Sequence, residues 1–94
     1  MNQSNNLFPE LTLLPQEVEN TYQFNGQLYS TQGFISEFGD EAFALAFVAA
    51  NRIINEIVKF QGGADYLQVF EYNNTRFWII DDVDHITVLL PSEY

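Results

Sequence analysis

The chain has 94 residues and no cysteine, and its 13 acidic residues outweigh 3 basic ones to give a formal net charge of −10. The lack of cysteine excludes disulfides, thiolate catalysis and cysteine-based zinc sites. The negative charge repels phosphate backbones and anionic lipids, so direct binding to nucleic acid or to a membrane is disfavoured. A hydrophobic fraction of 47% is sufficient for a folded core, and the length predicts a single domain over residues 1–94.

The N-terminal segment is predicted to be an arm rather than a regular element. Residues 1–6 are polar, and we expect them to be disordered. Prolines at positions 9 and 15 disfavour a helix, so residues 7–19 are expected to form an extended arm or linker lying on the domain or on another copy of it. The start of the chain lacks the pattern of a signal peptide, and no apolar run approaches the roughly 20 residues that span a bilayer. We therefore expect a soluble, cytoplasmic protein.

Residues 20–31 contain the pair Asn25 and Gly26, which is typical of a two-residue β-hairpin turn. Pairing outward from this turn sets Phe24 opposite Gln27. The two strands would be short and half polar, so we expect this hairpin at a sheet edge.

Residues 40–61 form the only segment long and periodic enough to predict a sizeable helix. Asp40 is a favourable N-cap residue, and Gly62 can adopt the left-handed conformation that ends a helix. Apolar residues at spacings of three and four predict the face that packs on the core. These residues are Phe43, Phe47, Ala50, Ile54, Ile57 and Val58, with Ala46 and Ile53 widening the stripe.

The C-terminal third predicts a three-stranded antiparallel meander. Two β-branched and aromatic runs, residues 65–72 and 75–81, flank the turn pair Asn73 and Asn74. A third run follows at residues 85–90. The predicted fold is therefore α+β, with one long helix packed on an antiparallel β-sheet in the order β-β-α-β-β-β.

Alternation with a period of two gives this meander two faces. One face carries Tyr66, Phe70, Tyr72, Phe77, Ile79, Ile86, Val88 and Leu90, and is predicted to hold the helix. The other face is more apolar than a solvated face should be, and a single helix cannot cover both. Exposed apolar patches of this kind are usually interaction sites. We therefore predict an interface formed by Leu67, Val69, Trp78, Ile80 and Leu89.

Asp81, Asp82, Asp84 and His85 form the only cluster with metal-ligand chemistry. Three carboxylates and an imidazole in one turn could hold Mg²⁺ or Ca²⁺, but the spacing lacks the central glycine and distal glutamate of an EF-hand loop. A solvated β-turn is the simpler interpretation. No sequence context positions a nucleophile beside His85, so we assign no catalytic residue, no cofactor and no metal, and we expect the protein not to be an enzyme.

The remaining function classes are types of macromolecular binding. We expect a small acidic protein-binding or regulatory module whose partner has a basic surface, and which forms a homodimer through its apolar face or its arm. One alternative is a nucleic-acid mimic that inhibits a DNA- or RNA-handling enzyme by presenting carboxylates in place of phosphates. A second alternative is a divalent-metal-dependent hydrolase that uses the cluster at residues 81–85.

Overall fold

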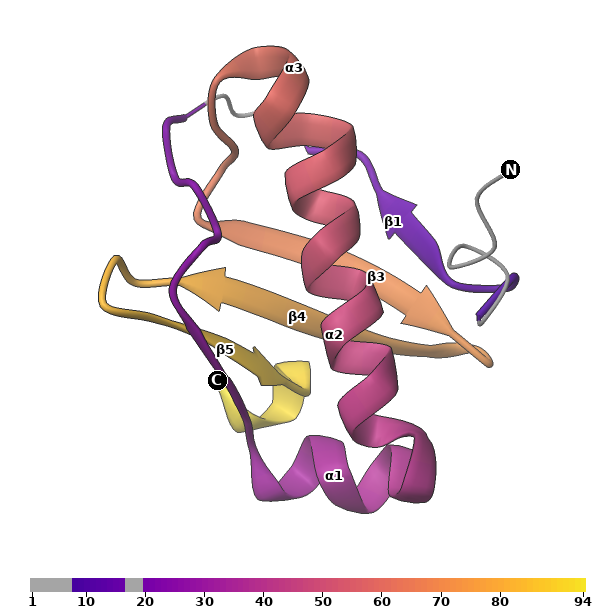
Figure 1. The fold of residues 1–94 in the computed structure, drawn as a ribbon. Helices are drawn as coiled ribbons and strands as arrows, with labels where there is room; N and C mark the ends of the chain where they lie inside the picture. The colour runs from indigo at the N-terminus through magenta and orange to yellow at the C-terminus, as the bar shows by residue number, and fades with distance from the viewer. Residues whose placement is uncertain (1–7, 17–19) are drawn as a thin grey trace.

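The computed structural model describes residues 8–16 and 20–94, which form a helical layer packed on a five-stranded sheet (Figure 1). The strand order is β1-β3-β4-β5-β2. Neighbouring strands are antiparallel except β2 and β5, which are parallel. The predicted α+β class is confirmed, although the sheet is mixed at one edge. The strands are β1 (Thr12–Leu14), β2 (Gln27–Ser30), β3 (Leu67–Tyr72), β4 (Thr75–Asp81) and β5 (His85–Leu89).

The helical layer begins well before the predicted start at residue 40. Asp40 lies within a 3-10 turn and does not cap the main helix, which has no side-chain cap. The cap belongs instead to the first helix, where the Thr31 side chain accepts a hydrogen bond from the Phe34 N–H. Gly62 ends the run in the left-handed conformation with φ of 82°, as predicted. The segments are α1 (Gln32–Phe38), a 3-10 turn (Gly39–Glu41), α2 (Ala42–Ile53), a π-helical turn (Ile54–Val58) and α3 (Lys59–Gln61).

The predicted core face of the helix is correct in part. Ala46, Ala50 and Ile53 are buried, and Ile54, Ile57 and Val58 pack partly buried against the core. Phe43 and Phe47 were expected in the core, but they are 74% and 64% exposed. The sheet and α1 already fill the space between the layers with aromatic rings, and the Phe70 and Phe77 rings stack with centroids 5.4 Å apart. Small side chains let the helix approach such a layer closely. The buried residues of α2 are Ala42, Leu45, Ala46, Ala49, Ala50 and Ile53.

The hairpin predicted at Asn25 and Gly26 is wrong. Tyr22 bridges to Ala64, which follows the helix, and β2 pairs in parallel with β5. Phe24 is 1% exposed and adopts a positive φ of 53°, so it is anchored in the core rather than in a strand. Long-range pairing and burial have outweighed the local preference for a turn.

The predicted meander is confirmed, including its register. Glu71 lies opposite Arg76, and Val69 lies opposite Trp78. Asn73 and Asn74 have φ values of 53° and 65°, the positive values that a type I′ turn requires.

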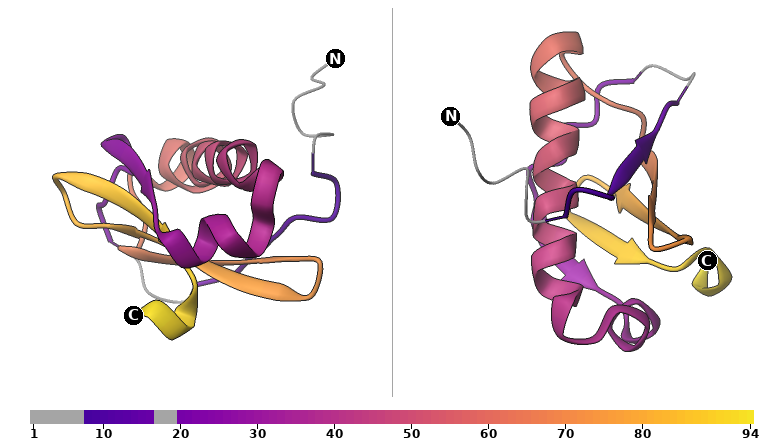
Figure 2. Two further views of the ribbon diagram at one scale, coloured as in Figure 1. Left: turned by 90° about the horizontal axis from the view of Figure 1, so that it is seen from below. Right: turned by 90° about the vertical axis from the view of Figure 1, so that its right-hand side faces the viewer.

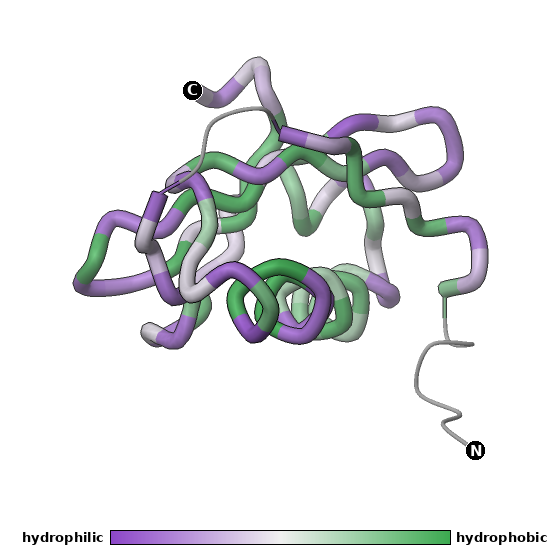
Figure 3. The backbone as a smooth tube through the Cα atoms, turned by 90° about the horizontal axis from the view of Figure 1, so that it is seen from above, coloured by the Kyte–Doolittle hydropathy of each residue, from purple (hydrophilic) through white to green (hydrophobic). Residues whose placement is uncertain are grey.

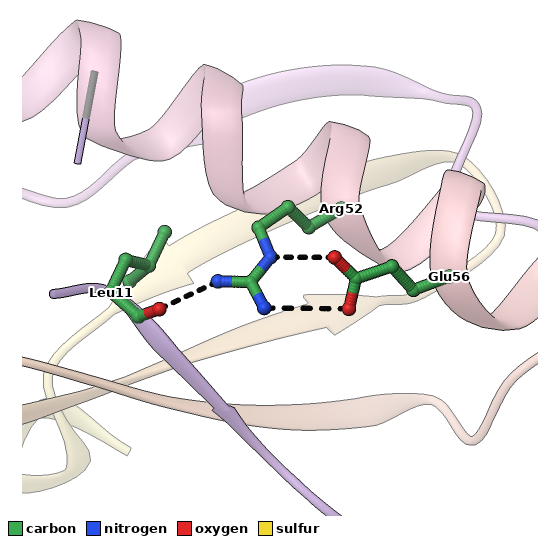
Figure 4. Close-up of polar contacts among 3 residues, drawn as sticks. All are labelled: Leu11, Arg52 and Glu56. Atoms are coloured by element: carbon green, nitrogen blue, oxygen red, sulfur yellow. Dashed lines mark hydrogen bonds and ion pairs between the residues drawn. The ribbon is translucent and has the colours of Figure 1, made fainter. Parts of the chain in front are cut away.

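Part of the N-terminal arm is an edge strand, because β1 pairs with β3. Arg52 on α2 fastens this arm by donating a hydrogen bond from Nη1 to the Leu11 carbonyl at 2.6 Å (Figure 4). The same guanidinium pairs with Glu56 at 2.9 Å. The disorder predicted for residues 1–6 lies outside the described residues, as do residues 7 and 17–19 of the extended arm or linker predicted at residues 7–19.

Candidate interaction surface

One face of the sheet packs against α2, and no α-helix of residues 8–16 and 20–94 covers the other face (Figure 2). The C-terminal 3-10 turn, Pro91–Glu93, lies on this open side, as the end-on view of the two layers also shows (Figure 3). In that view, hydrophobic residues occur both in the helical layer and in the sheet. An antiparallel sheet commonly leaves one face in water, but such a face is normally polar.

The centre of the open face is a line of four apolar side chains that crosses four strands. Strand register places Leu14 beside Val69, Val69 beside Trp78, and Trp78 beside Leu89. We call these four residues the apolar row. Leu14, Val69 and Trp78 are half-buried, and Leu89 is only 6% exposed. Cross-strand neighbours of this kind pack on one another and form a continuous surface.

A second row runs parallel to the first. Register aligns Leu67 with Ile80, Ile80 with Thr87, and Thr87 with Tyr29. Leu67 and Ile80 are half-buried, and Tyr29 is 49% exposed. The structure therefore brings all five residues of the predicted interface onto one face, and it adds Leu14 and Tyr29 from strands whose pairing partners are far away in sequence.

Polar residues border both rows. Glu71 and Arg76 lie opposite each other at one end, two residues beyond Val69 and Trp78 of the apolar row. His85 lies at the opposite end, where its Nε2 is 3.2 Å from the Asp82 carboxylate and its ring meets Tyr29 edge-on. An apolar centre with a polar rim is the usual anatomy of a protein interface.

The C-terminal turn is fixed beside the apolar row by Glu93, a residue that the sequence did not single out. The Glu93 carboxylate accepts hydrogen bonds from the Thr31 hydroxyl at 2.6 Å and from the backbone N–H groups of Gly33 and Leu90, each at 2.9 Å. These bonds hold the pKa of the Glu93 carboxyl below its usual value, and the bond from the Thr31 hydroxyl makes the largest contribution. The contact spans 60 residues or more for two of its three donors, so no local pattern could reveal it.

The predicted acidic cluster is not assembled as a metal site. Asp81 is 5% exposed and turns inward, where its two carboxylate oxygens accept the backbone N–H groups of Phe24 and Val83. Asp82 points instead to His85 and accepts its backbone N–H at 3.0 Å. Asp84 is exposed in the turn. Across residues 8–16 and 20–94, no three histidine, aspartate or glutamate side chains come together in a way that could hold a metal ion.

A cavity of about 360 Å³ lies next to Asp81 and is lined by residues 20–23, Asn25 and Val83. Three of its polar side chains, Asn20, Gln23 and Asp81, make hydrogen bonds within the protein. The Gln23 amide donates to the carbonyls of Thr21 and Gly62, and the Asn20 side chain accepts the Thr21 N–H.

Phe43 and Phe47 form a separate exposed apolar pair on α2. The sequence assigned them to the core because hydropathy alone does not separate a phenylalanine stripe from the neighbouring alanine stripe. They lie on the helical layer and so do not extend the sheet surface (Figure 1).

No family model matches the chain, and neither the curated proteins nor the solved structures contain a match. Among the residues that the structure describes, no helix combines the length and apolar character needed to cross a membrane.

Proposed function

We propose that this protein is a non-enzymatic binding module that docks a partner protein on the open face of its sheet. The observation that carries the proposal is the apolar row, Leu14, Val69, Trp78 and Leu89. It runs across four strands on the face that no α-helix of the described residues covers. A continuous apolar centre with a polar rim suits protein docking better than it suits the binding of a small polar ligand.

The charge of the chain points to the chemistry of the partner. A net charge of −10 attracts a basic surface over long distances and repels an acidic one. Asp82 and Asp84 are exposed near one end of the face, where they would meet basic residues around the docking site. The proposed partner therefore has an apolar patch bordered by lysine or arginine, and we place this interaction in the cytoplasm.

A second copy of the chain is the alternative occupant of the same face. Glu71 and Arg76 have opposite charges, so two copies related by a two-fold axis could pair across this end of the rim. The net charge of −10 on each copy opposes such a dimer. A basic partner therefore fits better, and the oligomeric state is an outcome of the test.

The test compares three baits in affinity capture from a lysate of the native cell. They are the wild-type chain, the double variant Val69→Thr and Ile80→Thr, and the control Phe47→Ala. Threonine keeps the β-branched shape that strands favour but makes the face polar, whereas the control removes an exposed ring from the other layer. We expect a basic protein to be retained by the wild type and by the control, and to be lost with the double variant.

Two measurements separate the alternatives. Light scattering of the free chain detects a dimer. If the wild type were dimeric and the double variant monomeric, a second copy of the chain rather than a basic partner would occupy the face. Elution with salt and competition by DNA detect nucleic-acid mimicry, because a carboxylate surface that replaces phosphates binds with steep salt dependence. If the double variant captured the same proteins as the wild type, the proposed docking surface would be wrong.

A further inference from the structure

We propose that residues 90–94 form a detachable strap that shields the Trp78 end of the apolar row, and that the Glu93 side chain is the latch that holds this strap closed. The inference deepens the proposed function and rests on it, because it assigns a means of regulation to the same face. The shielding itself can be measured on the free protein.

The strap is held by side-chain contacts of Glu93 and Tyr94 rather than by deep burial. Residues 91–94 are all exposed, and Tyr94 is 75% exposed, so beyond Leu90, which packs partly buried against the core, the strap buries little apolar area. Its polar attachment to the rest of the domain is made by Glu93, which bonds to Thr31 and Gly33 at the start of α1, and by Tyr94, whose side chain bonds to that of Tyr66. A segment with few buried contacts opens at a low free-energy cost. Loss of the Glu93 carboxylate removes its bonds to Thr31, Gly33 and Leu90 and is therefore expected to open the strap.

The strap contacts the residues that matter for docking. The Tyr94 ring meets the Trp78 ring edge-on, with centroids 5.4 Å apart and planes inclined at 69°. Leu89, which directly precedes the strap, is 6% exposed, whereas the other members of the apolar row are half-buried. A partner that docks flat on the row must displace the Tyr94 ring. The closed strap is therefore an autoinhibitory contact.

A substitution at Gly33 tests the Glu93 contact without changing Glu93 itself. A Cβ atom built at Gly33 would lie 2.4 Å from the Glu93 carboxylate oxygen, which is closer than any real contact of this kind. The φ of Gly33 is not positive, so alanine fits the backbone of α1 and favours the helix. Gly33→Ala should displace the Glu93 carboxylate from its hydrogen-bond donors and leave the charge of the chain unchanged.

The closing experiment uses Trp78 as the reporter, because it is the only tryptophan in the chain. Acrylamide quenching of its fluorescence is measured for the wild type and for Glu93→Gln and Gly33→Ala. Tyr94→Ala serves as the reference for an open strap, and Ser92→Ala, a change at an exposed position of the same segment, serves as the matched control. Binding of Nile red, an uncharged dye that fluoresces on apolar surfaces, is recorded in parallel.

We expect both latch variants to show the increased quenching and the red-shifted emission of Tyr94→Ala, together with stronger Nile red fluorescence, while Ser92→Ala matches the wild type. If Glu93→Gln and Gly33→Ala were both quenched like the wild type, the latch would be refuted. If Tyr94→Ala also matched the wild type, the strap would not shield Trp78 at all. Should Gly33→Ala lose its helical circular dichroism, Glu93→Gln decides the question alone.

None of these readouts involves a partner, so their failure would leave the proposed docking surface standing. Conversely, a latch that opens as expected in a protein that captures no partner would refute only the proposed function.

Discussion

The carboxylate of Asp81 accepts a hydrogen bond from the backbone N–H of Phe24 at 2.8 Å, across 57 positions of sequence. Its other oxygen accepts the N–H of Val83, also at 2.8 Å. Phe24 and Val83 both have positive φ values, 53° and 82°, which non-glycine residues adopt only when their surroundings hold them there. One buried side chain thus fixes two unfavourable backbone conformations and joins the segment before β2 to the turn after β4.

Asp81→Asn is expected to destabilise the fold by about 1–3 kcal/mol, because the amide has one acceptor oxygen for two N–H groups, that of Phe24 in a buried bond and that of Val83 in a partly buried one. The substitution preserves the side-chain volume, so a cavity does not contribute to the loss. Urea unfolding followed by the fluorescence of Trp78 measures the difference. Asp84→Asn is the control, since Asp84 is exposed in the same turn and its loss should change the stability by less than about 0.5 kcal/mol.

The packing of α2 predicts opposite outcomes for two neighbouring stripes. Ala49 is fully buried, so Ala49→Leu should overpack the space between helix and sheet and cost about 1–3 kcal/mol. Phe47 is 64% exposed, so Phe47→Ala should change the stability by less than about 0.5 kcal/mol. Thermal unfolding of both variants would show which face of α2 packs on the sheet. A large loss of stability in Phe47→Ala would mean that Phe47 lies in the core, as the sequence predicted.

This helix shows why some elements were predictable and others were not. The meander follows from local signals, since the turn pair Asn73 and Asn74 fixes the register that sets Val69 beside Trp78. The face of α2 depends on what lies beneath it. Because aromatic rings from the sheet and α1 occupy that space, alanines rather than phenylalanines face inward.

Long-range contacts limited the prediction of the candidate surface in the same way. Five of its residues follow from the alternation of the meander, but Leu14 joins the apolar row only because β1 pairs with β3. Glu93 and Asp81 are ordinary acidic residues in sequence. Each becomes a structural anchor through backbone N–H groups far along the chain. Such pairings are properties of the whole fold, and no window of residues contains them.

Arg52 is expected to stabilise the N-terminal arm more than its ion pair suggests. Glu56→Gln removes only a surface pair between neighbouring helical turns, which is worth about 0.3–0.5 kcal/mol. Arg52→Met also removes the 2.6 Å hydrogen bond to the Leu11 carbonyl, and a charged donor of this kind contributes about 1.5–3 kcal/mol when it is shielded from water. Because 24% of the Arg52 side chain is exposed to solvent, we expect a loss of stability at the low end of that range.

Hydrogen exchange of β1 (Thr12–Leu14) should accelerate in Arg52→Met and stay unchanged in Glu56→Gln. Equal protection of β1 in both variants would contradict the fastening role of Arg52.

The latch formed by Glu93 should open in acid. Its bonding partners are the Thr31 hydroxyl and two backbone N–H groups, none of which carries a charge, so the titrating group of the latch is Glu93 itself. Tyr66, whose pKa is raised by the neighbouring Tyr94, stays protonated in the acid range. The pKa of Glu93 is lower in the folded chain than the unfolded value of about 4.3. Its contribution to stability is therefore complete above that unfolded value and is lost as the pH falls through the folded pKa.

We expect acrylamide quenching of Trp78 to rise in the wild type as the pH falls from about 6 to 3, with a midpoint below the ordinary pKa of glutamate. Glu93→Gln should already be open at pH 6 and should lack this transition, because its amide carries no negative charge to lose. Glu41→Gln, which removes an exposed carboxylate from the turn before α2, should keep the transition and thereby exclude a general effect of net charge. A transition of equal size and midpoint in Glu93→Gln would show that another carboxylate controls the exposure of Trp78.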